Sequence, residues 1–363
     1  MGRILTSRDV EFAVKGGSVF ACGGGGWADH GRELGTLAVT AGRPELVDVA
    51  DVPDDAWIAT SAAIGAPGGL TEWQMLGVDY VRAVELLQDA LGQPVYGLII
   101  GQNGMSSTLN GWLPAALLGT KVIDAVGDVR AHPTGDMGSL GMANSPEPTI
   151  QTAAGGNRAK NLYMELVVRG ATANVSPVLR RAADQAGGFI ASARNPMRAS
   201  FVREKAAVGG ITLALRLGEA IAAAEPAGGD AVIRAICDAG DGEVLVRGTV
   251  SAKTLTYTSE AFDIGTIAIA DGAKRFVIHV MNEYMAVDAG STRVATYPDV
   301  ITTLDTAGRP VSAGNVREGD VLSILRVAKT RIPLSASVFD PSVYPVVEKA
   351  LGIEIASYAL APV

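Results

Sequence analysis

The sequence predicts an α/β fold of the multidomain α+β type, in which an N-terminal, mostly parallel sheet with helices precedes a β-rich C-terminal domain. Apolar strand-like runs alternate with helical patterns over the first 165 residues, which is typical of a parallel sheet. Beyond about residue 226 the pattern changes to short β-type runs separated by Asp/Gly turns, which indicates antiparallel strands. We therefore expect one domain over residues 1–165 and a second over residues 166–363, which begins with helices.

The N-terminal domain begins with a predicted helix over residues 7–14 and a strand over residues 18–22, which runs into four consecutive glycines, Gly23 to Gly26. Because glycine has no Cβ, such a loop lets backbone N–H groups approach a ligand closely. A helix that begins just after the loop adds unpaired N–H donors. The further predicted elements alternate in the same way. Helices are expected over residues 31–41, 70–91 and 113–118, and strands over residues 45–49, 56–62, 95–100, 121–125 and 161–168.

Four segments that follow predicted strands are expected to meet at one edge of the sheet: the glycine run, residues 65–69, residues 101–104 and the stretch after Ala125. Ligands of open α/β sheets bind beyond the carboxyl ends of the strands. Residues 128–157 are rich in Gly, Pro and Ser and have few periodic apolar positions, so we interpret them as a long functional loop. The sequence therefore predicts a binding site at this edge.

The C-terminal domain begins with two predicted helices, over residues 176–185 and 200–224. The segments that follow are short and rich in β-branched and aromatic residues, and Asp/Gly turns separate them. We expect them to form an antiparallel sheet. The predicted strands cover residues 232–237, 243–250, 254–259, 266–270, 275–281 and 321–327.

Composition limits the classes of partner. The chain has 363 residues, of which 48% are apolar and 19% charged, as in a compact globular enzyme. Its formal net charge of −8 argues against nucleic acid and anionic membranes as partners and favours a small neutral or cationic ligand. Cys22 and Cys237 form no CxxC pair, and the first residues lack the apolar segment of a secretory signal. We expect a cytoplasmic protein, with a homo-oligomer left open.

The glycine run admits three interpretations. Residues 23–28 satisfy the dinucleotide pattern G-x-G-x-x-A, and Asp48 and Asp51 lie near the expected place of a ribose-binding carboxylate. Asp29 argues against a nucleotide, because its negative charge would face a pyrophosphate at the helix start. A plain packing loop is the second interpretation. The one we favour is an active-site loop for a small molecule.

Several short motifs follow one another along the chain. They are residues 21–26 (ACGGGG), 65–67 (GAP), 100–103 (IGQN), 124–134 (DAVGDVRAHPT), 282–286 (NEYMA) and 298–301 (PDVI). In order and spacing they resemble the motifs of the family formerly grouped as DUF917 and named after S-methyl thiohydantoin desulfurase, over nearly the whole chain. Family acids are replaced here by Ile100, Val126 and Thr134, and His132 replaces an aromatic residue.

The resemblance implies hydrolysis of an S-methyl thiohydantoin, a hydantoin or a related small cyclic amide or amidine, by attack of water on a C=N or C=O carbon. Such a reaction needs a base for the water, an acid for the ring nitrogen and donors for the developing charge. The candidate catalytic residues are Asp29, His30, Asp124, His132 and Glu283. The candidate substrate-binding residues are Cys22, Gly24, Gly25, Gly26, Asn103, Arg130 and Asn282.

Alternatives remain open at this point. Asp124 equally fits a helix or turn cap, Cys22 a buried apolar position, and His30 a solvent-facing residue. The sequence requires no cofactor, and a metal ion would find only His30 and His132 as plausible histidine ligands. Because three family acids are replaced, a non-catalytic heterocycle-binding or partner subunit is a further alternative, as is a nucleotide-dependent enzyme that uses residues 23–28.

Overall fold

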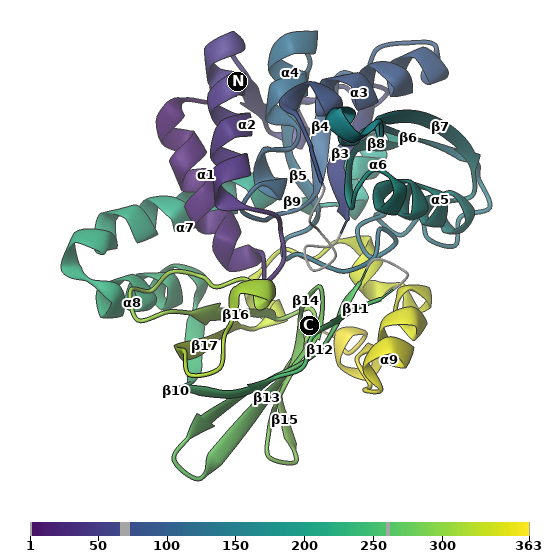
Figure 1. Cartoon of the computed structure of the whole chain (residues 1–363). Coiled ribbons are helices and arrows are strands. Elements are labelled where there is room, and N and C mark those ends of the chain that lie inside the picture. Colours follow the sequence, from purple (N-terminus) through teal and green to yellow (C-terminus); the bar gives the residue numbers. More distant parts are fainter. Residues whose placement is uncertain (1, 66–72, 259–261, 363) are drawn as a thin grey trace.

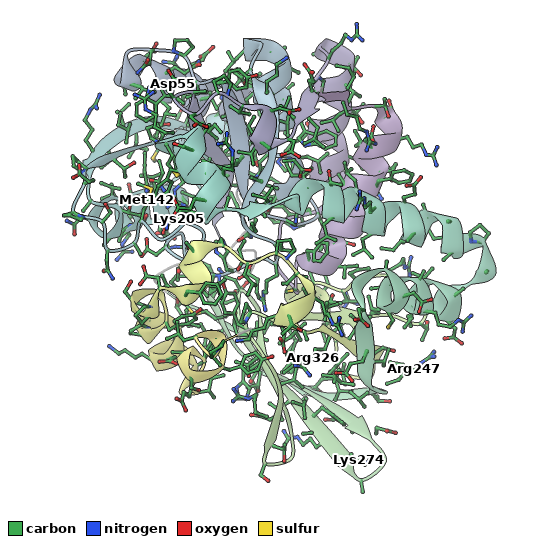
Figure 2. All side chains as sticks on the ribbon, turned by 180° about the vertical axis from the view of Figure 1, so that it is seen from behind. Asp55, Met142, Lys205, Arg247, Lys274 and Arg326 are labelled. Carbon is green, nitrogen blue, oxygen red and sulfur yellow. The ribbon has the colours of Figure 1, made fainter. Side chains whose placement is uncertain are left out.

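The computed structural model describes residues 2–65, 73–258 and 262–362 and confirms an α/β fold of two domains (Figure 1). A mixed sheet covered by helices, sheet A, forms one domain, and an antiparallel sheet, sheet B, forms the other. Side chains fill the interior of both (Figure 2), with Asp55 at the outer end of the first domain and Lys274 at the tip of a hairpin of the second. Parts of the predicted segments 65–69, 70–91 and 254–259 lie outside the described residues.

Sheet A has the strand order β1-β2-β5-β4-β3-β8-β6-β7, and β9 pairs with β5. Strands β2, β5, β4 and β3 run parallel to one another, whereas β8, β6 and β7 continue the sheet in antiparallel pairs. The sheet takes strands from both sides of residue 165. The strands are β1 (Arg3–Ile4), β2 (Glu45–Val47), β3 (Trp57–Gly65), β4 (Gly97–Gln102), β5 (Lys121–Asp128), β6 (Thr149–Gly155), β7 (Met164–Gly170), β8 (Phe189–Arg198) and β9 (Ala207–Val208).

Sheet B has the order β15-β14-β13-β12-β10-β17-β16, and β11 pairs with β12. All its pairs are antiparallel, as the short runs separated by turns predict. Its first described strand begins at Gly242, after the helical segment. The strands are β10 (Gly242–Lys253), β11 (Thr256–Tyr257), β12 (Asp263–Asp271), β13 (Lys274–Met281), β14 (Glu283–Ala289), β15 (Thr292–Thr296), β16 (Val300–Leu304) and β17 (Val321–Val327).

Helices pack against sheet A and at the boundary between the two sheets (Figure 1). The α-helices are α1 (Ser7–Phe20), α2 (Ala28–Ala41), α3 (Gly77–Leu91), α4 (Trp112–Leu118), α5 (Thr172–Gln185), α6 (Ala199–Lys205), α7 (Gly210–Ala224), α8 (Gly229–Gly240), α9 (Pro345–Leu351) and α10 (Ala356–Ala359). In the described part of the chain, no helix combines the length and apolar character that crossing a bilayer requires.

Two predicted strands are wrong, because both segments are helical. Residues 18–22 contain the end of α1, where Val19 and Phe20 are buried in the same apolar cluster as Val10 and Val14. Residues 232–237 lie in α8, whose buried positions Val232, Ile233 and Ile236 have helical spacing. In both segments, packing against neighbouring elements decides the secondary structure and overrides the strand propensity of the β-branched and aromatic residues.

Strands β6 and β8 are not predicted by the sequence pattern, and the loop expected over residues 128–157 is wrong where β6 occupies it. Both strands are buried on both faces inside sheet A, so alternation of apolar and polar residues is absent. The helix expected over residues 200–224 is interrupted. Gly209 adopts a left-handed conformation (φ 79°) there and separates α6 and β9 from α7.

Helices α1 and α7 lie side by side and bring their backbones unusually close (Figure 1). A Cβ added at Gly16 of α1 would lie 1.8 Å from the carbonyl oxygen of Ala214, and one at Gly218 of α7 would lie 1.9 Å from that of Phe12. Each helix therefore places a glycine against the backbone of the other. The largest apolar cluster surrounds this crossing and continues through α8 to β16 and β17, so one core joins the two domains.

We expect Gly16→Ala to lower the free energy of unfolding by about 1–3 kcal/mol or more, because the added methyl group overpacks the helix crossing. Urea denaturation followed by circular dichroism measures the change. Gly314→Ala is the matched control, since a Cβ there meets nothing within 4 Å and its effect should stay within about 0.5 kcal/mol. Equal midpoints for the two variants would contradict the close crossing.

Candidate active site

A cavity of about 440 Å³ lies where the ends of β3 and β4, the glycine run and the segment after β5 meet α5, β8 and the start of β14. The predicted convergence of these loops is therefore confirmed for the described residues. The glycine run reaches this edge from a helix rather than from a strand. Polar side chains that line the cavity include Ser106, Ser107, His132, Asp136, Arg180, Arg181, Asp184, Arg194, Asn282 and Glu283.

The glycine run packs so tightly that side chains are excluded. A Cβ at Gly24 would lie 2.2 Å from Oε1 of Glu283, and one at Gly26 would lie 1.9 Å from Oγ of Ser106. The N–H groups of Gly25 and Gly26 donate to none of the described residues, and both glycines line the cavity. A dinucleotide fingerprint requires a strand before the loop. Because α1 precedes it here, the nucleotide interpretation lacks its structural context.

Glu283 lies at the start of β14, where its side chain is buried against the glycine run. Its Oε2 atom accepts a hydrogen bond from no residue of the described chain. Burial raises the pKa of Glu283 to about 8, although the charges of Arg130 and Arg180 act in the opposite direction. At neutral pH this carboxyl group is therefore mostly protonated, and it can donate a proton inside the cavity.

His132 lies in the turn after β5 and lines the same cavity. Its backbone N–H donates to Oε1 of Gln102 at 3.0 Å, and its Nε2 lies 3.4 Å from the carbonyl oxygen of Gly101. Burial lowers the pKa of His132 to about 4, so the imidazole is neutral at pH 7 and able to accept a proton. Glu283 and His132 thus supply a neutral acid and a neutral base to one cavity.

Several lining residues have no motif in the sequence that singles them out. Arg180 lies on α5, and its Nη2 donates to the carbonyl oxygen of Pro133 at 2.9 Å. Arg194 lies on the buried strand β8, and its Nη2 donates to Oγ of Ser176 at 2.8 Å. Asp136, by contrast, falls in a segment expected to be functional, the loop over residues 128–157.

The predicted residues Asp29 and His30 do not line the cavity. The carboxylate of Asp29 is fully exposed and pairs with Nη1 of Arg32 at 3.1 Å. His30 is buried, with its Nε2 3.4 Å from the hydroxyl of Tyr80, and burial lowers its pKa. The alternative in which His30 faces solvent is therefore wrong, because α2 turns it toward Tyr80.

Asp124 also lies outside the cavity, on β5, where it caps α7. Its Oδ1 accepts hydrogen bonds from the backbone N–H groups of Ile211 and Thr212, both at 3.0 Å. Its Oδ2 accepts one from the hydroxyl of Thr212 at 2.5 Å. The capping alternative therefore accounts for these three hydrogen bonds of the carboxylate.

Asn103 and Cys22 are buried beside the cavity without lining it. Nδ2 of Asn103 donates to the carbonyl oxygens of Val129 and Gly210, so its amide joins three segments of backbone. Burial raises the pKa of Cys22 to about 11, which keeps it a thiol at neutral pH. Asn282 does line the cavity, and its Oδ1 accepts the backbone N–H of Asp263 at 2.9 Å.

Arg130 is completely buried between the two sheets and does not line the cavity. Its Nε donates to the carbonyl oxygen of Ala131 at 2.8 Å. Its Nη1 donates to those of Tyr284 and Asp299, at 3.0 and 3.1 Å. The guanidinium also lies 5.0 Å from the ring centroid of Tyr297. These contacts hold the residue that follows Glu283, so Arg130 positions the site.

The three residues that replace family acids lie in two different environments, the apolar core and the cavity wall. Ile100 and Val126 face each other as register partners on β4 and β5, and both are fully buried in the main apolar cluster. Thr134 lines the cavity. Two of the three replacements therefore fall in the core of this chain, away from the cavity wall. Within residues 2–65, 73–258 and 262–362, no three His, Cys, Asp or Glu side chains are grouped closely enough to hold a metal ion.

Comparison with known families covers most of the chain. The S-Me-THD-like N-terminal domain matches residues 8–163, and the S-Me-THD-like C-terminal domain matches residues 171–337. The chain belongs to the S-Me-THD-like family. The resemblance drawn from the sequence motifs is thereby confirmed, and membership supports a function of the thiohydantoin desulfurase type at the level of the family.

Comparison with solved structures gives information on the fold of this S-Me-THD-like protein. A crystal structure of a protein from Chromobacterium violaceum superposes with a TM-score of 0.72 over 96% of each chain, at 22% sequence identity. At that identity the similarity establishes a shared fold only. No protein with a curated description matches the chain significantly.

In this S-Me-THD-like protein we expect Asp124→Ala to lower the free energy of unfolding by about 1–2 kcal/mol, because α7 loses its N-terminal hydrogen-bond acceptor. Ligand binding in the cavity should be unchanged. Thermal melting and calorimetric titration measure the two effects. Asp124→Asn, which keeps an acceptor oxygen, should recover most of the stability. Loss of binding with unchanged stability would contradict the capping role.

Proposed function

We propose that this protein hydrolyses a small cyclic amide or amidine, such as an S-methyl thiohydantoin or a hydantoin, in the cavity between its two sheets. The observation that carries the proposal is Glu283, a buried carboxyl whose Oε2 accepts a hydrogen bond from no described residue, beside a glycine loop that lines the same cavity. Family membership supports the same class of substrate.

The shape and lining of the cavity suit a small heterocycle. Trp27 lines it and stacks on Trp73, with ring centroids 4.3 Å apart, while Phe189 meets Trp27 edge-on at 4.8 Å. Such an apolar wall with a few polar groups opposite is typical of small-molecule sites, and 440 Å³ lies within their usual size. A planar ring can lie against the aromatic wall and present its polar edge to Glu283 and His132.

The reaction begins as the oxygen of water forms a bond to the C=N carbon. His132 takes one proton of that water, and the ring nitrogen takes the proton of Glu283. The N–H groups of Gly25 and Gly26 stabilise the charge that develops at the attacked carbon's substituents. As the C–S bond breaks, the new hydroxyl returns its proton to Glu283 and forms C=O. His132 delivers its proton to the leaving thiolate, so the products are hydantoin and methanethiol.

We expect Glu283→Gln to reduce kcat/KM for S-methyl thiohydantoin by at least about a hundredfold, because glutamine cannot transfer the proton. Release of methanethiol, followed with a thiol reagent, measures turnover. Glu204→Gln, an exposed position on α6, is the matched control and should keep full activity. If the wild-type protein binds the heterocycles and turns none of them over, it is a binding or partner subunit and the proposal fails.

The activity should also depend on pH in a defined way. Since Glu283 acts as the acid, kcat/KM should fall as pH rises through about 8, the pKa of Glu283. On the acidic side it should fall as His132 becomes protonated near pH 4. A profile measured between about pH 3 and pH 10 covers both limbs, and one that stays flat across about pH 8 would contradict the role of Glu283.

The free energy of unfolding should also depend on the ionisation of Glu283. The pKa of Glu283 is raised from 4.5 to about 8, so its contribution is fully present below pH 4.5 and is lost as pH rises through about 8. We expect the free energy of unfolding to decrease by a few kcal/mol over this interval in the wild type and by clearly less in Glu283→Gln. Urea denaturation at pH 5, 7 and 9 measures the difference, and parallel slopes would contradict a buried neutral carboxyl.

A further inference from the structure

Strand β7 forms a long edge of sheet A that no described strand covers. It pairs with β6 on one side, over the seven residues from Met164 to Gly170, and it lies at the outer edge of the first domain (Figure 1). The opposite end of the sheet is β1, which has two residues. An edge strand presents a row of backbone N–H and C=O groups that can pair with a further strand. Strand β7 is therefore long enough to extend the sheet.

The two faces of β7 differ in character. One face packs against the apolar cluster to which α5 contributes, through Met164, Leu166 and Val168. The other face is exposed and consists of Glu165, Val167 and Arg169. Val167 has 47% of its surface exposed, although it is an apolar residue in the middle of a strand. The exposed face thus has an apolar centre between one acid and one base.

This order of side chains is complementary to itself. When two copies of β7 pair antiparallel about a two-fold axis at Val167, each Val167 lies opposite its counterpart, and Glu165 of each copy lies opposite Arg169 of the other. Opposite charges at such cross-strand positions contribute about 0.2–1 kcal/mol. A shift by two residues in either direction would place Glu165 opposite Val167 or Ala171 instead. The charges therefore favour a single register.

Both charged side chains also have partners within the chain. Glu165 accepts hydrogen bonds from Nε and Nη2 of Arg82, at 2.9 and 3.1 Å, and from the hydroxyl of Tyr163 at 2.8 Å. Arg169 donates through Nη2 to the carbonyl oxygen of Ala90. These contacts orient the two side chains along the outer face of β7 while leaving them exposed. A second copy therefore meets charges whose positions are already set.

A groove of about 310 Å³ lies beside the edge, between α3, α4 and the turn before β7. Its lining includes the exposed side chains of Val78, Leu117 and Tyr163, and Arg82 connects it to Glu165 of β7. Two acids and two arginines of the lining balance in charge, whereas the whole chain carries −8. Two acidic molecules repel each other least where such balanced surfaces meet. The surroundings of β7 thus suit a second copy of the chain.

We propose that two copies of this chain associate through β7, in the antiparallel register centred on Val167, so that sheet A continues from one protomer into the other. Backbone hydrogen bonds between the two edges supply attraction, and the contacts of Glu165 with Arg169 fix the register. The inference is independent of the proposed hydrolysis, because the described lining of the cavity contains no residue of β7. A strand of an unrelated protein would lack this two-fold match.

Sedimentation velocity of the full chain, at concentrations from about 1 to 100 µM, measures the association. We expect the wild type to form a dimer. Val167→Lys places two like charges at the two-fold axis and should raise the dissociation constant at least about tenfold. Val244→Lys is the matched control, since Val244 is an exposed valine on β10 of sheet B, and it should leave the dissociation constant unchanged. Thermal melting checks that each variant is folded.

A mixing experiment tests the register. Glu165→Lys and Arg169→Glu each place like charges opposite each other in a dimer of identical chains, so each variant alone should dissociate more readily than the wild type. In an equimolar mixture both cross-strand pairs again join opposite charges, and a heterodimer of nearly wild-type affinity should form. A monomeric wild type at every concentration would overturn the inference. A dimer that Val167→Lys leaves intact, or charge variants that fail to associate on mixing, would overturn it as well.

Discussion

The arrangement of the site depends on one buried cation, Arg130. Its guanidinium donates to backbone carbonyl oxygens on either side of the boundary between the sheets, those of Ala131, Tyr284 and Asp299. The backbone bonds from Tyr284 to Cys22 and from Ala131 to Phe20 continue this connection to the start of the glycine run. A point charge could not satisfy these diverging acceptors, whereas the rigid fork of arginine can. The acid, the glycine loop and the loop of His132 are therefore fixed relative to one another by this side chain together with the two backbone hydrogen bonds.

The sequence predicts the fold class well because local patterns carry it. Residues 31–41, 95–100 and 121–125 alternate between helix and strand character, and the observed α2, β4 and β5 follow them closely. Segments whose structure is decided by distant contacts are predicted poorly. The end of α1 and the whole of α8 are rich in residues that favour strands. In the structure these residues form part of the buried apolar face of a helix. Strands β6 and β8 are buried within the sheet, so their sequences lack the alternation of apolar and polar residues that would predict a strand.

The candidate site could be predicted in part for the same reason. Glu283, Asn282, His132 and the glycines lie in recognisable motifs, and the structure brings them to one cavity. Asp29 and Asp124 are carboxylates, as an acid or base requires, but Asp29 faces solvent and Asp124 faces the end of a helix. Only the three-dimensional arrangement reveals this. Arg180 and Arg194 belong to an ordinary amphipathic helix and an ordinary buried strand. Their position in the cavity lining depends on where α5 and β8 place them, and no motif in the sequence indicates it.

The close crossing of α1 and α7 has a consequence for how the chain is made. Helix α1 is synthesised first, yet its partner surface is completed only some two hundred residues later, and sheet A also waits for β8. Contacts of such sequence separation slow folding and leave apolar surface exposed in the meantime. The segment that ends at residue 163 would leave the edge of β3 unpaired and the glycine face of α1 uncovered during translation. The two family segments are thus halves of one folding unit, and the N-terminal half has these surfaces uncovered until the second half emerges.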